Sequence, residues 1–315
     1  MPIDLAAYVW SRLPVALMAG LAMVPAIMMA TVPPSLGAEL ARQGTVRVDQ
    51  FGDVKIHSYV SPVDGWLVNS QIVEGPKELV IFDAQLLLPY AEEVADYAAS
   101  LGKPVNRIVI SHGHPDHWSG LQVLTERFPS ARVYALQGVA EALKARGDRV
   151  LAAMRGMFGE RVASKVTVPT EIIAEDDQTI DGVAYKFRSY TDAESELQLV
   201  AFLPDQKVVL AFDLVFSPRD HLFIVAPNFD HWINILQDLK AATRDYDTIL
   251  IGHDGPVDSA AFEATYVYLL NAKEAYATHT FAKGYADVLK AWFPDRERSE
   301  WLEFSSGLLY APPQN

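Results

Sequence analysis

The 315-residue chain contains no cysteine. Disulfides, thiolate metal sites and a cysteine nucleophile are therefore excluded, and any metal must be bound by His, Asp or Glu. Basic residues are also few, because 26 Lys and Arg stand against 40 Asp and Glu, and the formal net charge is -14. No run of Lys and Arg offsets this charge locally. Since such a surface repels nucleic acids and anionic lipids, we expect a small-molecule substrate and no nucleic-acid partner.

The amino-terminal segment differs from the rest of the chain. No charged residue occurs from Leu13 to Ala38, and Arg12 comes directly before this apolar stretch. This order is typical of a secretory signal, so residues 1–38 are predicted to be a cleaved signal peptide and the protein to be periplasmic or secreted. The alternative is an uncleaved membrane anchor, since about 20 apolar residues suffice to span a bilayer. A membrane contact is expected only in that second case.

Residues 45–315 are predicted to form a single α/β domain with a helical carboxyl-terminal extension. Short β-rich runs alternate with segments of helical periodicity, and no internal repeat or low-complexity linker interrupts them. Two groups of strands, each followed by helices, predict a four-layer αββα sandwich. Strands are expected at 54–60, 66–73, 79–82, 107–110, 133–136, 183–190, 197–203, 208–212 and 248–251, and helices at 87–101, 119–128, 138–163 and 232–244, with Ser119 capping the second helix.

A cluster of ligand-type side chains follows the expected strand at 107–110. His112, His114, Asp116 and His117 lie within six residues, and Gly113 and Pro115 make the loop tight. His112 and His114 are two apart at a strand exit, so both imidazoles point to one side. Crowding four such groups into one small volume is costly unless a cation neutralises them. The sequence therefore predicts a metal site here.

This H-x-H-x-D-H run resembles the signature of the metallo-β-lactamase superfamily, and the similarity extends from about Trp66 to Gly255. The resemblance implies an αββα fold with two metal positions. It assigns His112 and His114 to the first position and Asp116 and His117 to the second.

Three further elements extend the resemblance, two of them later in the chain and one earlier. Asp213 ends the strand-and-turn segment 199–213 and stands where the family has a carboxylate that bridges the two metals, although Phe212 replaces the usual glycine. His253, in the Gly-His element after the strand at 248–251, is implied as the remaining ligand of the second metal. Asp83 corresponds to the acidic residue at the end of an early strand that supports the ligand loop.

The chain departs from the family at the third ligand of the first metal. The family supplies a histidine there, whereas this chain has Thr191-Asp192-Ala193-Glu194-Ser195-Glu196. Counting back from Pro204 places Glu194 at the histidine position, and alkylsulfatase-like members of the superfamily use glutamates in this region. Asp192 and Glu196 share a strand face with Glu194 and are alternatives. The three acids can also be a solvated strand edge beside a damaged first site.

The ligand set and the resemblance together predict a metallo-hydrolase. Two divalent metal ions, zinc first and manganese or iron as alternatives, would share an activated hydroxide, and Asp116 would act both as a ligand and as a proton acceptor. The expected substrate has an ester-like bond, namely a lactam, lactone, carboxylic ester, sulfate ester or thioester. Two alternatives remain: a mononuclear iron oxidoreductase of the same fold, and a non-catalytic binding protein that the metal stabilises.

Substrate-binding residues are expected close to the ligands in sequence. Trp118 follows the ligand loop and is expected either to line the substrate mouth or, equally, to pack under the loop. His221 and His231 lie in an aromatic-rich stretch after Asp213 that also contains Phe223. Two further segments are expected to be structural. Met154, Met157 and Phe158 are expected to form an apolar helix face, with an apolar flap over the site as the alternative, and 295–300 is expected to be a solvated helix start.

Overall fold

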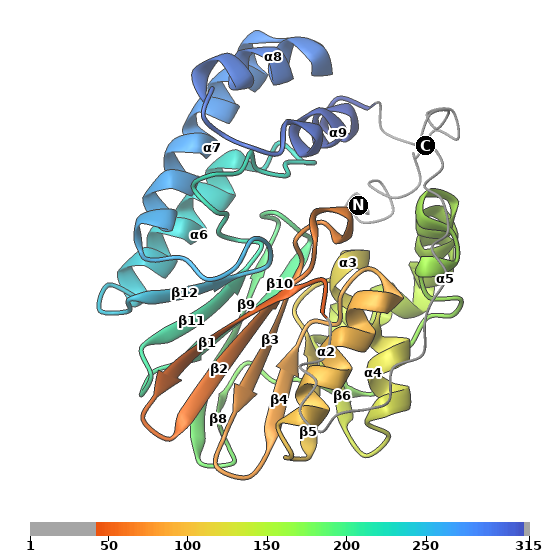
Figure 1. The fold of residues 1–315 in the computed structure, drawn as a ribbon. Helices are drawn as coiled ribbons and strands as arrows, with labels where there is room; N and C mark the ends of the chain where they lie inside the picture. Colours follow the sequence, from red (N-terminus) through yellow and green to blue (C-terminus); the bar gives the residue numbers. More distant parts are fainter. Residues whose placement is uncertain (1–41, 312–315) are drawn as a thin grey trace, which may run out of the picture.

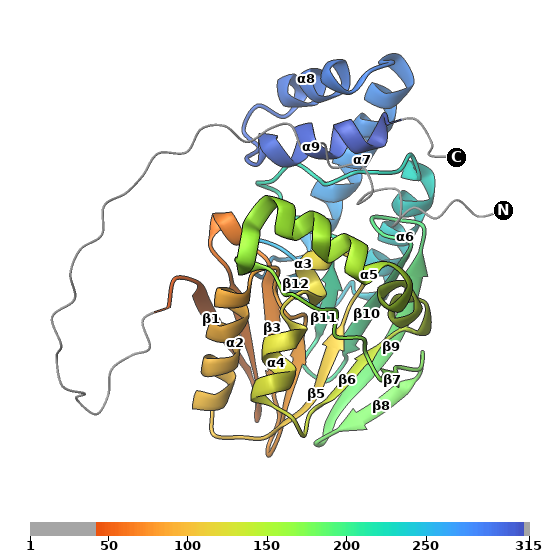
Figure 2. The same cartoon turned by 90° about the vertical axis from the view of Figure 1, so that its right-hand side faces the viewer.

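The computed structural model describes residues 42–311, and the predicted signal or anchor segment lies outside this range. Two β-sheets pack face to face, and helices cover the outer side of each (Figure 1, Figure 2). The four-layer αββα arrangement predicted from the order of strands and helices is therefore present.

The first sheet contains seven strands in sequential order. They are β1 (Thr45–Phe51), β2 (Val54–Val60), β3 (Asn69–Glu74), β4 (Leu79–Phe82), β5 (Val105–Ile110), β6 (Arg132–Ala135) and β7 (Glu171–Ile172). Pairing is antiparallel from β1 to β4 and parallel from β4 to β7. The parallel part places the carboxyl ends of β4 and β5 side by side, which positions Asp83 beside the ligand loop.

The second sheet has five strands in the order β12-β11-β10-β9-β8. They are β8 (Asp177–Ile180), β9 (Val183–Thr191), β10 (Leu197–Leu203), β11 (Val208–Phe212) and β12 (Thr248–Ile251). Neighbours pair antiparallel except β11 and β12, which run parallel. Asp213 and His253 therefore leave the same edge of this sheet.

Helices lie on both outer faces of the sandwich. Those associated with the first sheet are α2 (Leu88–Ser100), α3 (Pro115–Trp118), α4 (Leu121–Arg127) and α5 (Gln137–Phe158), and those on the second are α6 (Phe229–Ala242) and α7 (Ala260–Thr278). Beyond the end of the sheets, α8 (Ala282–Trp292) packs on α7, and α9 (Ser299–Leu309) packs on α8 (Figure 1, Figure 2). Single 3-10 turns occur at η1 (Val63–Gly65) and η2 (Gly159–Arg161). Within residues 42–311, no helix has the length and apolar character needed to cross a membrane.

Alternation along β10 explains how one strand serves two cores. Leu199, Ala201 and Leu203 are buried against the first sheet. Val200 and Phe202 point the other way, into the cluster that includes α6 and α7. Because successive strand residues face opposite sides, a continuous apolar run is what a strand buried on both faces requires.

Several boundaries differ from the sequence prediction, among them the end of the helix expected at 138–163, which is at Phe158. Two of the differences have a reason in the backbone. The strand expected at 66–73 begins only at Asn69, because Trp66 and Leu67 adopt left-handed φ values of 65° and 55° that end any extended run. The helix expected from Ser119 begins at Leu121 instead, because the amide of Ser119 still bonds to the carbonyl of Pro115 in the short α3.

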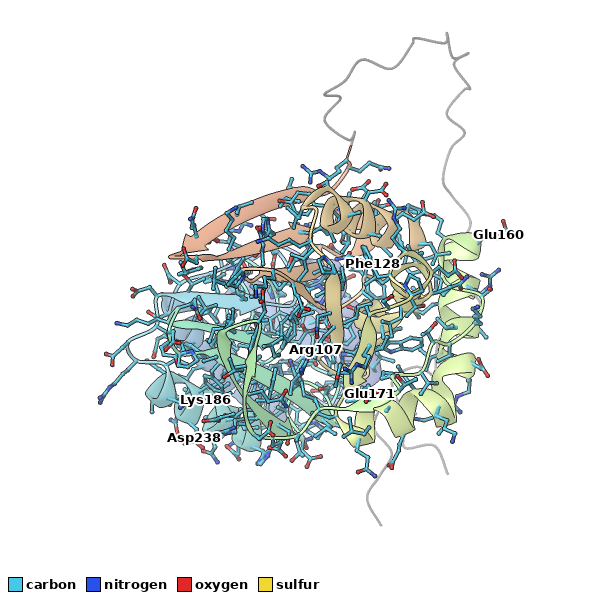
Figure 3. The ribbon with its side chains drawn as sticks, turned by 90° about the horizontal axis from the view of Figure 1, so that it is seen from below. Arg107, Phe128, Glu160, Glu171, Lys186 and Asp238 are labelled. Atoms are coloured by element: carbon cyan, nitrogen blue, oxygen red, sulfur yellow. The ribbon has the colours of Figure 1, made fainter. Side chains whose placement is uncertain are left out.

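Hydrogen bonds join the two sheets at both ends. At one end, the amide of Leu199 donates to the carbonyl of Ser111 at 2.8 Å, and the amide of Asn69 donates to the carbonyl of Gly252 at 2.7 Å. At the other end, seen from below in Figure 3, Arg107 of β5 donates to Gln178 of β8 at 2.9 Å. The first end carries the ligand loop and is the functional end.

Candidate metal centre

Seven predicted ligands from both sheets meet at one end of the sandwich. Three loops that follow β5, β11 and β12, and the turn between β9 and β10, contribute them: His112, His114, Asp116, His117, Glu194, Asp213 and His253. Six are buried and His253 is partly buried. Their ligand atoms form two groups, and within each group these atoms lie within 4.8 Å of one another.

The first group contains two histidines and two carboxylates. Nδ1 of His114 lies 3.1 Å from Oε1 of Glu194, and Nε2 of His112 lies 3.7 Å from Oε2 of the same carboxylate. The structure therefore places Glu194 at the position where sequence counting put it. Glu196 instead pairs with Arg146 at 3.2 Å, and Asp192 is exposed.

The second group consists of Asp116, His117 and His253. Oδ2 of Asp116 lies 3.4 Å from Nε2 of His117 and 3.4 Å from Nε2 of His253. Three ligand atoms from two distant loops thus face one point, where a cation would complete the set.

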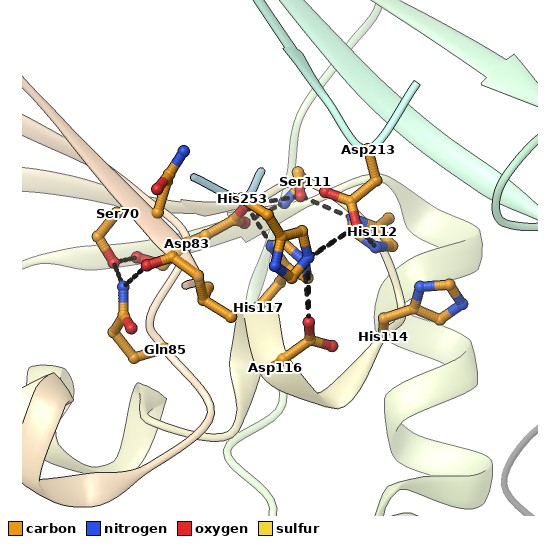
Figure 4. A network of polar contacts seen from close by, with 12 residues as sticks. Ser70, Asp83, Gln85, Ser111, His112, His114, Asp116, His117, Asp213 and His253 are labelled. Atoms are coloured by element: carbon orange, nitrogen blue, oxygen red, sulfur yellow. Dashed lines mark hydrogen bonds and ion pairs between the residues drawn. The ribbon is translucent and has the colours of Figure 1, made fainter. Parts of the chain in front are cut away.

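Asp213 lies between the two groups. Its Oδ2 is 3.8 Å from Nε2 of His112, 3.4 Å from that of His117 and 3.2 Å from that of His253. A Cβ atom on Gly252 would collide with Oδ1 of Asp213, so glycine is needed for the β12 loop to approach. This arrangement suits a carboxylate shared by two cations (Figure 4).

Divalent cations fit this donor set. Nε2 of His112, Nε2 of His117, both oxygens of Glu194 and Oδ1 of Asp213 are buried without a hydrogen-bond partner in the described part of the chain. Each such atom costs about 1–3 kcal/mol if left unsatisfied. Bound cations would give partners to the two imidazole nitrogens and to the carboxylate of Glu194, whereas Oδ1 of Asp213 faces the backbone of Gly252.

The charges of the centre are strongly coupled. Burial alone would lower the pKa of His117, but the carboxylates of Asp213, Asp116 and Asp83 outweigh this and raise it well above its ordinary value. Burial also lowers the pKa of His253, but Asp213 and Asp116 outweigh it and raise this pKa to about 9. The histidines hold the pKa of Asp213 well below its usual range despite burial. Protonated imidazoles therefore offset the negative charge of the carboxylates, which bound cations would otherwise neutralise. Asp213 stays ionised, as a metal ligand must.

A second layer of hydrogen bonds orients the imidazoles. Oδ2 of Asp83 lies 2.8 Å from Nδ1 of His117, and its two oxygens also accept from the amide and the hydroxyl of Ser111, each at 2.8 Å. Nδ1 of His253 lies 2.8 Å from the carbonyl of Trp66. Because Nδ1 is engaged in both rings, Nε2 is the atom left to face the centre.

A cavity of about 350 Å³ opens above the centre. Its floor contains His114, Asp116, Glu194, Asp213 and His253. Its walls are mainly apolar and come from η1, α5, the stretch after β11 and α9: Val63, Trp66, Met157, Phe158, Phe216, Phe223, Trp301 and Phe304. Asp64 and Glu300 complete the lining and are exposed, so they mark the open end.

The three residues expected to bind substrate lie outside this lining. Trp118 is buried under the ligand loop, where its Nε1 donates to the carbonyl of Gly113 at 3.0 Å. His221 is buried with Nδ1 2.9 Å from the hydroxyl of Tyr268. His231 is exposed on α6. Closeness in sequence to a ligand therefore did not place these side chains in the cavity.

Other segments supply the walls instead. Met157 and Phe158, for which a flap over the site was the alternative to a plain helix face, end α5 and line the cavity, and Phe158 packs against Trp66 with ring centroids 5.5 Å apart. The stretch 295–300 was expected to be a solvated helix start, and Glu300 is indeed exposed in the first turn of α9, where it also lines the open end of the cavity. The aromatic stretch after Asp213 does contribute Phe223, as its composition indicated.

Residues 63–253 match the family model of the metallo-beta-lactamase superfamily. The chain belongs to this superfamily. The matched range contains all seven ligands and Asp83, so the family resemblance found from the H-x-H-x-D-H motif is confirmed.

Curated members of the superfamily that resemble this chain include sulfatases. A linear primary-alkylsulfatase from a Pseudomonas strain is 25% identical over 176 residues, which cover 47% of this chain and 33% of the relative. An alkyl/aryl-sulfatase from Saccharomyces cerevisiae is 26% identical over 190 residues, or 50% of this chain and 29% of the relative. The matches thus span about a third of the length of these relatives.

Solved structures show the same fold. A metallo-beta-lactamase from Pontibacter korlensis superposes with a TM-score of 0.57 and 18% identity, covering 72% of this chain and 100% of that one. The stereoselective inverting sec-alkylsulfatase from a Pseudomonas species gives 0.56 and 20% identity, covering 81% of this chain and 48% of that one. At such identities the likeness concerns the fold.

Proposed function

We propose that this protein is an exported hydrolase that uses two divalent cations to cleave an ester-like bond in a small molecule. One observation carries the proposal: two groups of buried ligand atoms, with Asp213 between them, form the floor of a mainly apolar cavity. The names of the relatives add sulfate esters and lactams to the candidate substrates. Carboxylic esters, lactones and thioesters share the same bond polarity and remain in the set.

Each residue has a place in this proposal. His112, His114 and Glu194 would hold one cation, Asp116, His117 and His253 the other, with Asp213 between them. When bound, divalent cations in such a centre act as Lewis acids on the scissile group and activate water at neutral pH. Glu194 supplies a negative charge where an imidazole would be neutral, which favours harder cations such as manganese or iron beside zinc.

The protein's own groups orient the reaction. Asp116 lines the cavity floor, and the neighbouring histidines keep its pKa below the usual range despite its burial. It is therefore ionised and placed to accept a proton from the attacking water. The apolar walls bind the substrate body and exclude bulk water from the reacting bond.

Export is part of the proposal and rests on the uncharged stretch from Leu13 to Ala38 after Arg12. Mass spectrometry of the protein recovered from the periplasm or medium tests it. A mature amino terminus near residue 38 supports a cleaved signal, an intact one in the membrane fraction supports the anchor, and recovery from the cytoplasm alone rejects export.

Hydrolysis is tested with protein loaded with zinc, manganese or iron and a panel of 4-nitrophenyl esters, a lactone, a lactam and 4-nitrophenyl sulfate. At least one substrate should turn over, and Asp116→Ala should reduce kcat by about 100-fold or more, as loss of a metal ligand and proton acceptor implies. Asp96→Ala, at a half-exposed position of α2, is the matched control and should behave as the parent. A stoichiometric metal content with no turnover would favour a metal-stabilised binding protein, and dioxygen consumption by iron-loaded protein would favour an oxidoreductase.

A further inference from the structure

The charge of the cavity lining is one-sided. Among the residues that line it there is no lysine and no arginine. Its carboxylates are Asp64, Asp116, Glu194, Asp213 and Glu300. Three of them face the proposed cations, so Asp64 and Glu300 decide the charge of the open end.

These two acids have different surroundings. Asp64 lies 2.6 Å from Nη2 of Arg161 and accepts a hydrogen bond from the hydroxyl of Tyr90 at 2.5 Å, so its charge is largely compensated. Glu300 is exposed in the first turn of α9, and no basic side chain in residues 42–311 pairs with it. Glu300 therefore presents a negative charge to anything that enters the cavity.

The wall between the open end and the centre is aromatic. Trp301, next to Glu300, packs edge-on against His253 with ring centroids 5.2 Å apart. Phe304, one turn further along α9, contacts Phe223 at 6.1 Å between centroids. A substrate body lying along these rings gains from apolar burial, whereas a negative charge on it would lie against aromatic faces and a carboxylate without a cationic partner.

We propose that the substrate is an uncharged carboxylic ester or lactone with an apolar body, and that Glu300 is a specificity-determining residue that disfavours anionic substrates. The proposal rests on the hydrolase function proposed above and narrows its substrate class. Hydrolysis consumes one water: its oxygen bonds to the carbonyl carbon, the ester C–O bond breaks, and the leaving oxygen takes a proton. A sulfate monoester carries a permanent negative charge for which the cavity lining has no lysine or arginine, so only the proposed cations would offset it.

The test compares two esters of equal length with the metal-loaded protein. 4-Nitrophenyl hexanoate is neutral, and the mono-4-nitrophenyl ester of adipic acid carries a carboxylate where hexanoate has its methyl end. We expect kcat/KM to favour the neutral ester by about tenfold or more, since a single unpaired like charge accounts for a factor of this order. Equal values, or a preference for the anionic ester, would overturn the proposal.

Variants on α9 assign the effect to Glu300. Glu300→Gln should lower the neutral-to-anionic ratio by about threefold and Glu300→Lys by more, because the field at the open end weakens and then reverses. Glu303→Gln is the matched control: Glu303 is exposed on the same helix and pairs with Lys290 at 2.8 Å, outside the cavity lining. A ratio that stays constant in both Glu300 variants removes Glu300 from the proposal.

A third arm separates this proposal from the broader one. If 4-nitrophenyl sulfate has a higher kcat/KM than the hexanoate ester, the hydrolase function stands and the uncharged substrate class falls. If neither substrate is hydrolysed, the hydrolase function fails. The charge preference of the cavity is then measured as ligand binding, followed by tryptophan fluorescence, since Trp66 and Trp301 line the cavity. Tighter binding of 1-octanol than of octyl sulfate supports an uncharged ligand, and equal or tighter binding of octyl sulfate rejects it.

Discussion

Oδ2 of Asp83 lies 2.8 Å from Nδ1 of His117, and both side chains are fully buried. The contact joins the carboxyl ends of two neighbouring parallel strands, since Asp83 follows β4 and His117 follows β5. It fixes the ring of His117 with Nε2 toward the proposed second cation.

Replacing Asp83 by Asn should weaken metal binding by about 10- to 100-fold, the usual effect of losing a carboxylate behind a ligating histidine. Competition with a chromogenic zinc chelator measures the affinity. Asp96→Asn is the control, because Asp96 is half-exposed on α2 and pairs with Arg127, and neither residue belongs to the ligand groups or the cavity lining. A change below twofold for Asp83→Asn would mean that the ring of His117 is held by packing alone.

Glu194→Ala should reduce the bound metal from two equivalents toward one, because the first group would keep His112, His114 and Asp213 but lose a carboxylate. Glu194→His should retain both ions, since imidazole is the family's own ligand there. Metal analysis by plasma mass spectrometry gives the stoichiometry. Glu196→Ala, two residues away, should leave it unchanged, and metal loss in this variant instead would transfer the ligand role to Glu196.

Trp301→Ala should raise KM for apolar esters by about tenfold, equivalent to about 1.4 kcal/mol of lost apolar contact, with a smaller change in kcat. Steady-state kinetics measure both constants. Trp292→Ala on α8, a residue that is 40% exposed, provides the control. A fall in kcat with unchanged KM would show that Trp301 acts through the packing of His253 instead of through the substrate.

His221 should affect how the stability of the fold depends on pH, and it should not affect turnover. Burial, followed by the charge of Arg296, lowers its pKa from 6.5 to about 4. The unfolded imidazole therefore takes up a proton as pH falls below 6.5 while the folded one does not, so its contribution is complete above pH 6.5 and is lost as pH falls to about 4.

The glutamine side chain of the His221→Gln variant cannot be protonated in this range. The difference in Tm between the parent and this variant should therefore become smaller from pH 7 to pH 4. Thermal denaturation at several pH values measures it. His231→Gln, at the exposed position on α6, should follow the parent throughout. A gap that stays constant with pH would contradict a neutral buried His221.

The ligand loop was predictable because its residues are contiguous and follow a strong strand signal. Asp213 and His253 were found through the family motif. Phe212 shows that the motif can accept phenylalanine in place of its usual glycine. Phe212 keeps a left-handed φ of 47°, the conformation that favours glycine, while its ring is buried and lies 6.1 Å from Phe82. Packing of the aromatic ring offsets the backbone cost there.

The cavity walls were harder to predict from the sequence. Trp66 and Trp301 lie near opposite ends of the described chain, and periodicity says nothing about which distant helices meet over a site. Trp118, His221 and His231 were chosen because they lie close to ligands in sequence. Tertiary packing instead buries Trp118 and His221 away from the cavity and leaves His231 exposed. Local pattern indicated the ligands, whereas tertiary packing determined the pocket.

Each ligand group draws on both sheets: His112 and His114 are joined by Glu194, and Asp116 and His117 by His253. Neither half of the chain can therefore retain a cation by itself. A molecule whose two sheets have separated would release its metal. Metal that is still bound after dialysis would therefore indicate that the two sheets are packed together.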